Sequence, residues 1–137
     1  MRLVQDEKDW IFQEVINDFV KLAKTEKGLN VIKKLIHFVQ ERVPSQLIII
    51  QIMLENPKLF ISNFYANYAI QLIIQTWKVE TVKPLFSLIL GKIKEYSVHK
   101  CSSNVVETMM CYSPPEIRAE YIKEICSMHD LHSKNVT

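Results

Sequence analysis

A short motif recurs along the chain at nearly constant spacing, and a tandem repeat constrains the fold more than any other sequence feature. Its three copies read GLNVIK at 28–33, ANYAIQ at 66–71 and SSNVVE at 102–107. The first residues of successive copies lie 38 and 36 positions apart. Each copy follows the order small, variable, Asn or Tyr, apolar, apolar, polar, and continues into an apolar-rich stretch typical of a helix. A unit of this length cannot bury its apolar face alone, so the repeat predicts an all-α solenoid of stacked units.

After a break, each unit continues into a second stretch that is also expected to be helical. These stretches cover 46–54, 82–93 and 116–127. Proline is tolerated in the first turn of a helix but breaks its interior, so a proline at such a break marks a helix start. The prolines at these places are Pro44, Pro84 and Pro115. Each unit is therefore expected to hold two or three helices.

The repeat also predicts approximate unit limits, at 10–43, 44–80 and 81–128. Between Trp10 and Ala23 the apolar residues share one helical face. This pattern indicates the last helix of an earlier unit running into a short first helix. The tail at 129–137 is polar and is predicted to be a loop or a frayed end.

The composition supports a helical core but does not indicate which partners the chain binds. The chain has 137 residues, of which 48% are apolar and 2 are glycine, a number too low for loop-rich β folds or phosphate-binding loops. Its formal charge of +2 is too small to predict nucleic-acid binding through bulk charge. Any such site must rest on a local arrangement of side chains.

Several other classes of protein are disfavoured. The 3 cysteines show neither paired spacing nor a metal-ligand pattern, and reduced thiols suit a cytoplasmic location. No apolar run approaches the roughly 20 residues that span a bilayer, so no membrane partner is expected. No catalytic triad, paired-carboxylate site or phosphate loop is recognisable, so we expect no enzyme, catalytic residue, small-molecule substrate, cofactor or metal.

Three segments resemble a known repeat family. The segments NFYANYAIQ at 63–71 and SVHKCSSNVVE at 97–107 are similar to the middle helix of a PUF (Pumilio-type) RNA-binding repeat, and 122–130 resembles the stretch that leaves its penultimate repeat. The resemblance runs from about residue 10 onward and is weak in the first unit. It implies a right-handed solenoid and a partial Pumilio homology domain over 1–137. Its units would correspond to the fifth to seventh of the family's usual eight repeats.

In that family the middle helix of each repeat contacts one RNA base. Two side chains four residues apart contact the base edge, and the residue after the first of them stacks on the base. Residues at this spacing share one helix face. The resemblance implies base-edge contacts from Asn67, Gln71, Ser103 and Glu107, and stacking contacts from Tyr68 and Asn104.

The donors and acceptors of these side chains suggest which bases they prefer. Ionised Glu107 only accepts hydrogen bonds, which suits the adjacent donors on the edge of guanine. Asn67 and Gln71 each offer a donor and an acceptor, which can match uracil. Because family members run antiparallel to their RNA, the resemblance implies a 5′-GU-3′ core within a UGU-like element of single-stranded RNA.

The first unit departs from this pattern. Leu29 cannot form a hydrogen bond with a base edge, and Lys33 can only donate. We therefore expect only weak RNA contacts outside the second and third motifs. The residues considered for such contacts are Leu29, Asn30, Lys33, His99 and Lys100.

The function implied by the resemblance is sequence-selective binding of messenger RNA, in 3′-untranslated regions, for post-transcriptional regulation with possible protein co-regulators. Two alternatives remain open. The chain could be a protein-binding scaffold of the HEAT/armadillo kind, or a diverged PUF-type protein that does not recognise bases. In either case Gln71 and Glu107 would be solvated side chains on the outer face of their helices.

Overall fold

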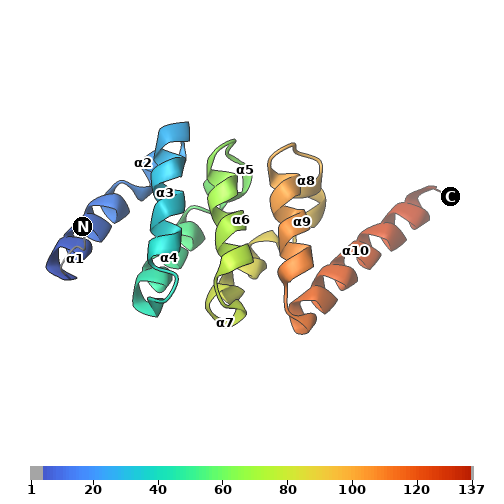
Figure 1. The fold of residues 1–137 in the computed structure, drawn as a ribbon. Helices are drawn as coiled ribbons and strands as arrows, with labels where there is room; N and C mark the ends of the chain where they lie inside the picture. The colour runs from blue at the N-terminus through green and yellow to red at the C-terminus, as the bar shows by residue number, and fades with distance from the viewer. Residues whose placement is uncertain (1–4, 137) are drawn as a thin grey trace.

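A computed structural model describes residues 5–136, with side chains described for 9–127. Every element in this part of the chain is helical, and the predicted all-α repeat solenoid is confirmed (Figure 1). The elements are α1 (Gln5–Asn17), α2 (Phe19–Ala23), α3 (Glu26–Phe38), α4 (Val43–Glu55), α5 (Pro57–Ser62), α6 (Ala66–Thr76), α7 (Val79–Val82), the 3-10 helix η1 (Lys83–Ile89), α8 (Ile93–Ser97), α9 (Ser102–Tyr112) and α10 (Pro115–Val136).

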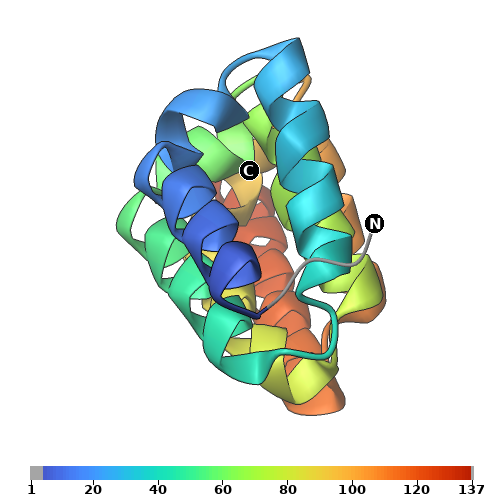
Figure 2. The ribbon, with the colours of Figure 1, turned by 60° about the vertical axis from the view of Figure 1, so that its left-hand side comes forward.

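The helices group into repeated units, each with a short helix, then a middle helix, then a third helix. Helix α1 precedes the first unit. The units are α2–α3–α4, then α5–α6 with α7 and η1, then α8–α9–α10. The middle helices α3, α6 and α9 lie side by side in one row (Figure 1), and the third helices form a second row behind them (Figure 2). The boundary between repeats in a tandem array can be drawn at any position within the repeat. The unit limits at 10–43, 44–80 and 81–128 therefore remain a prediction.

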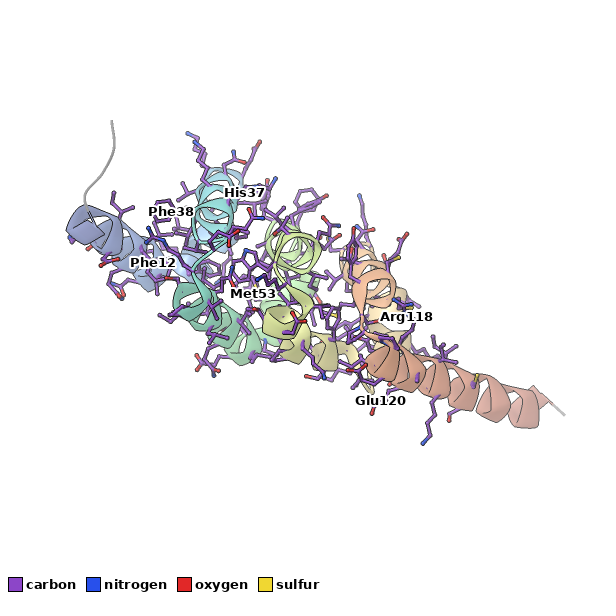
Figure 3. The ribbon with its side chains drawn as sticks, turned by 60° about the horizontal axis from the view of Figure 1, so that its bottom comes forward. Phe12, His37, Phe38, Met53, Arg118 and Glu120 are labelled. Atoms are coloured by element: carbon purple, nitrogen blue, oxygen red, sulfur yellow. The ribbon has the colours of Figure 1, made fainter. Side chains whose placement is uncertain are left out.

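The core lies between the two rows. Met53 lies there (Figure 3). Buried isoleucines of α3 and α6 also belong to the core, and α9 contributes buried valines and a buried methionine. Trp77 joins adjacent units, because its indole Nε1 donates to the carbonyl oxygen of Ile36 at 3.2 Å. The apolar residues of the repeated motif therefore form one continuous core, as stacking of repeat units requires.

The small residue that opens each motif is required by close helix packing. Gly28 lies against α2, where an added Cβ would stand 2.1 Å from the carbonyl oxygen of Leu22. The equivalent residues Ala66 and Ser102 are also buried, and Ser102 donates to the carbonyl oxygen of Tyr96 at 2.6 Å. The short helix of each unit thus crosses the start of its middle helix at close range.

Polar contacts fix α10 against the preceding unit. The buried Tyr121 hydroxyl donates to the carbonyl oxygen of Phe86 in η1. The Glu124 carboxylate accepts from the backbone N–H groups of Gly91 and Ile93. Gly91 has φ +81°, a conformation that favours glycine. The two bonds to Glu124 hold the turn that leads into α8.

The structure confirms some predicted helix limits and corrects others. Pro44 and Pro115 lie in the first turns of α4 and α10, and Pro84 lies in the first turn of η1. The stretch at 82–93 was predicted to be one helix, but a 3-10 helix ends at Ile89 and a turn follows, because Gly91 takes a left-handed conformation. The tail predicted to be irregular continues α10 as far as Val136, over residues that contain neither proline nor glycine. Within the described residues, no helix is long and apolar enough to cross a membrane.

Candidate nucleic-acid interface

The exposed residues of the motifs lie on the outer surface of α3, α6 and α9, which we call the middle-helix face. His37 marks this side of α3 in Figure 3, whereas Glu120 lies on the outer side of α10, away from the face. Asn30, Tyr68 and Asn104 occupy the same motif position and are exposed in all three units. This row of exposed side chains places a flat amide or ring at regular intervals along the array.

Two equivalent hollows recur on this face. The first, of about 380 Å³, lies between α3 and α6 and is lined by Lys33, His37, Tyr68, Gln71, Leu72 and Gln75. The second, of about 320 Å³, lies between α6 and α9 and is lined by Tyr68, Gln71, Gln75, Asn104, Glu107, Thr108, Cys111 and Tyr112. Six residues of the second hollow stand at the repeat positions of the six that line the first. The array therefore repeats a cavity as well as a helix.

Tyr68 is the residue around which these hollows are arranged. It lines both of them, and it lines a third hollow of about 350 Å³ beside Leu29 and Asn30. The Lys33 ammonium lies 5.9 Å from the centroid of its ring. An exposed aromatic ring with a cation beside it is suited to stack on a base near a phosphate.

In the second unit, the structure brings the two predicted edge residues together but leaves only one of them accessible. Asn67 is 1% exposed, and its Nδ2 donates to the carbonyl oxygens of Asn63 and Phe64, both at 2.8 Å. Its Oδ1 accepts from Gln71 Nε2 at 2.9 Å. Gln71 is half-buried and lines the hollows. In this arrangement Asn67 holds Gln71, and its own contact with a base stays a prediction.

In the third unit, both predicted edge residues reach the surface. Glu107 is exposed, and Ser103 is half-buried with its hydroxyl donating to the carbonyl oxygen of Lys100 at 3.1 Å. The Ser103 oxygen keeps lone pairs that can accept a further bond. The two residues line a larger hollow of about 530 Å³ beside α8 and α10. Carboxylate and hydroxyl are thus available to one ligand.

The residues predicted to make weak RNA contacts differ in how exposed they are. Leu29 is buried, although it lines the hollow beside Tyr68, and Lys33 is half-buried. Asn30 is exposed, as are His99 and Lys100 in the turn before α9. The structure therefore places Leu29 in the core, Asn30 and Lys33 on the middle-helix face, and His99 and Lys100 in the turn before α9.

Sequence reasoning did not identify Gln75, Tyr112 or Thr108, which also line the second hollow. Gln75 could have been found, because it follows Gln71 by one helical turn. Thr108 could not, since it meets Gln71 only after two helices pack together. Among the described residues, no group of three metal-ligating side chains is assembled.

Part of the chain that contains the third motif matches the model of a known repeat family. The family model of the Pumilio-family RNA binding repeat matches residues 92–126, which span α8, α9 and the first half of α10 and include Ser103, Asn104 and Glu107. No curated protein matches the chain. The predicted resemblance is confirmed for the third helical unit. Over residues 92–126 the chain is therefore similar to a Pumilio-family RNA binding repeat, and this similarity lies within an all-α repeat solenoid.

Proposed function

We propose that the chain binds single-stranded RNA with sequence selectivity, one base to each unit. The observation that supports this function is the recurrence of equivalent hollows on successive middle helices. Each has a polar side chain, Gln71 or Glu107, at one repeat position and an exposed flat side chain, Tyr68 or Asn104, at another. A peptide-binding solenoid does not require this combination at a fixed repeat.

The chemistry of each unit suggests its base. Glu107 and Ser103 suit guanine, which presents two adjacent donors that a carboxylate can accept. Gln71, held by Asn67, suits uracil, which presents a donor beside an acceptor. The proposed core is 5′-GU-3′ in a UGU-like element. The proposed setting is the 3′-untranslated region of messenger RNA in the cytoplasm, in post-transcriptional regulation.

The affinity of the chain for a short RNA is expected to be modest. Stacking contributes roughly 1–3 kcal/mol per base and a good edge contact about as much. Association costs about 4–15 kcal/mol in lost freedom. Dissociation constants in the micromolar range or weaker follow, so the assay must extend to high protein concentration.

The test is a fluorescence anisotropy titration of a labelled uridine-rich RNA containing UGU, compared with the same RNA in which ACA replaces UGU. The chain should prefer the UGU RNA. Tyr68→Ala should weaken binding of both RNAs about tenfold, because it removes a stacking platform. The control, Trp10→Ala, removes an exposed aromatic ring from α1, outside the middle-helix face, and should leave binding unchanged.

Equal binding of the two RNAs, with Tyr68→Ala and Trp10→Ala indistinguishable, would favour the alternatives. The chain would then be a protein-binding solenoid or a Pumilio-type relative without base recognition.

A further inference from the structure

Thr108 links two units at the site proposed for uracil. It is buried on α9, and its hydroxyl donates to Gln71 Oε1 on α6 at 2.9 Å. Both residues line the second hollow. The amide of Gln71 is therefore held by its own helix through Asn67 and by the next unit through Thr108.

The direction of these hydrogen bonds is fixed by the backbone. The carbonyl oxygens of Asn63 and Phe64 can only accept, so the Asn67 amide must turn its nitrogen towards them. Its oxygen then faces Gln71, which must donate with Nε2. The Gln71 oxygen is left facing α9, where the Thr108 hydroxyl donates to it.

We infer that Thr108 is a specificity-determining residue that acts through Gln71 and makes the second unit prefer uracil to cytosine. The held amide retains one N–H and one lone pair for a ligand, in a fixed order. Uracil presents a ring N–H beside a carbonyl oxygen. Cytosine presents a ring nitrogen acceptor beside an amino donor, the inverse pattern, and would require the amide to turn over.

This inference rests on the proposed RNA binding and explains why the second unit prefers uracil to cytosine. It assigns Asn67 and Thr108 to positioning, with Gln71 as the residue that contacts the base. Gln75 provides a contrast on the same face. It is exposed and, within the described part of the chain, makes no hydrogen bond through its amide.

The first experiment compares RNAs that carry UGU or UGC in the same flanking sequence. Wild type should prefer UGU. Thr108→Val keeps the shape but removes the donor, and should reduce that preference about two- to tenfold, the equivalent of one hydrogen bond. Thr108→Ser restores the hydroxyl and should restore the preference. In the control Thr76→Val, the lost hydroxyl donates to the carbonyl oxygen of Leu72 in its own helix, at 2.7 Å, and the preference should not change.

The second experiment needs no RNA. Side-chain ¹⁵N relaxation of the full chain should show the Gln71 amide as more ordered than that of Gln75, and Thr108→Val should reduce the difference. A Gln71 amide as mobile as Gln75 in wild type would overturn the inference whatever the RNA results are. A preference for UGU that Thr108→Val leaves intact would also overturn it, while leaving the proposed function standing. Ordered Gln71 without any RNA binding would refute the function and the uracil preference together.

Discussion

Glu107 and Gln71 occupy the same position in successive units and differ in what they offer a base. An ionised carboxylate offers only acceptors, whereas an amide offers one donor and one acceptor. The bases proposed for the two units follow from this difference. Exchanging the side chains should therefore exchange the preference.

The double substitution Ser103→Asn with Glu107→Gln copies the edge residues of the second unit into the third. We expect the preferred core to shift from 5′-GU-3′ to 5′-UU-3′ by about 1–3 kcal/mol. The lower end of this range is expected, because in the described structure no hydroxyl holds the third-unit side chain as Thr108 holds Gln71. Competition binding of both RNAs measures the shift.

The matched control is Glu120→Gln, which removes the same charge from the outer side of α10 (Figure 3). It should change neither preference. An equal loss of affinity for both RNAs in the double variant would mean that Ser103 and Glu107 support the surface without contacting a base.

A second residue-scale prediction concerns Tyr121 and alkaline pH. Burial raises the pKa of the Tyr121 phenol above its usual value, and the nearby Glu124 carboxylate raises this pKa further. The folded state therefore keeps the proton more tightly than the unfolded state. The contribution to stability is fully present below the unfolded pKa of about 10 and is lost as pH rises above it.

Tyr121→Phe should lower the stability at neutral pH by about 1–3 kcal/mol, because the Phe86 carbonyl loses its buried donor. Its melting temperature should then fall less steeply than that of wild type above pH 10. Melting curves between pH 8 and 11 provide the comparison. Parallel pH profiles for the two proteins would show that Tyr121 does not control alkaline stability.

At this scale the sequence predicts what lies on one helix. Tyr68, Gln71 and Glu107 were predicted from the family resemblance together with their spacing on one helix, and the structure places all three on the middle-helix face. The burial of Asn67 was not predicted, because its exposure depends on how the turn before α6 folds over it. Thr108 was missed because its partner, Gln71, lies on another helix, so their contact depends on how the two helices pack.

At the scale of elements, the close crossing of short and middle helices is the most stringent packing requirement. Gly28→Ala would place a methyl group against backbone atoms of Leu22, which cannot move unless α2 moves. We expect a loss of about 3 kcal/mol or more, at the upper end for overpacked sites. Chemical denaturation measures the change.

Gly91→Ala is the matched control, since the space around Gly91 is open and only its φ of +81° opposes a side chain. Its cost should be about 1–2 kcal/mol. A smaller loss for Gly28→Ala than for Gly91→Ala would show that α2 shifts freely and that the small residue is not a packing requirement.

The elements themselves were predictable where apolar spacing was regular. The pattern over 10–23 indicated two successive helices, and the structure separates α1 from α2 at Asp18. The segment after α7 was not predictable in type, because buried Phe86 and Ile89 are three residues apart, a spacing that suits both a 3-10 and an α-helix.

At the scale of the whole molecule, equivalent surfaces in successive units differ in exposure. Ile50 and Met53 on α4 are buried, as are Phe86 and Ile89 on η1, which follow them by 36 residues. The next pair at the same spacing is on α10, where Ile122 is 55% exposed and Ile125 is 39% exposed. The face that a following unit covers in the first two units is therefore open in the third.

An exposed apolar face of this kind favours association. We expect the sedimentation coefficient of the wild-type chain to rise with concentration, and the double substitution Ile122→Gln with Ile125→Gln to suppress the rise. Because neither side chain belongs to the buried core, the variant should lose much less stability than a core substitution would. Val43→Gln with Leu47→Gln removes two exposed apolar side chains from α4 and serves as the control, with self-association expected to persist. A monomer at every concentration, or equal suppression by both double variants, would show that the open face of α10 has no role in association.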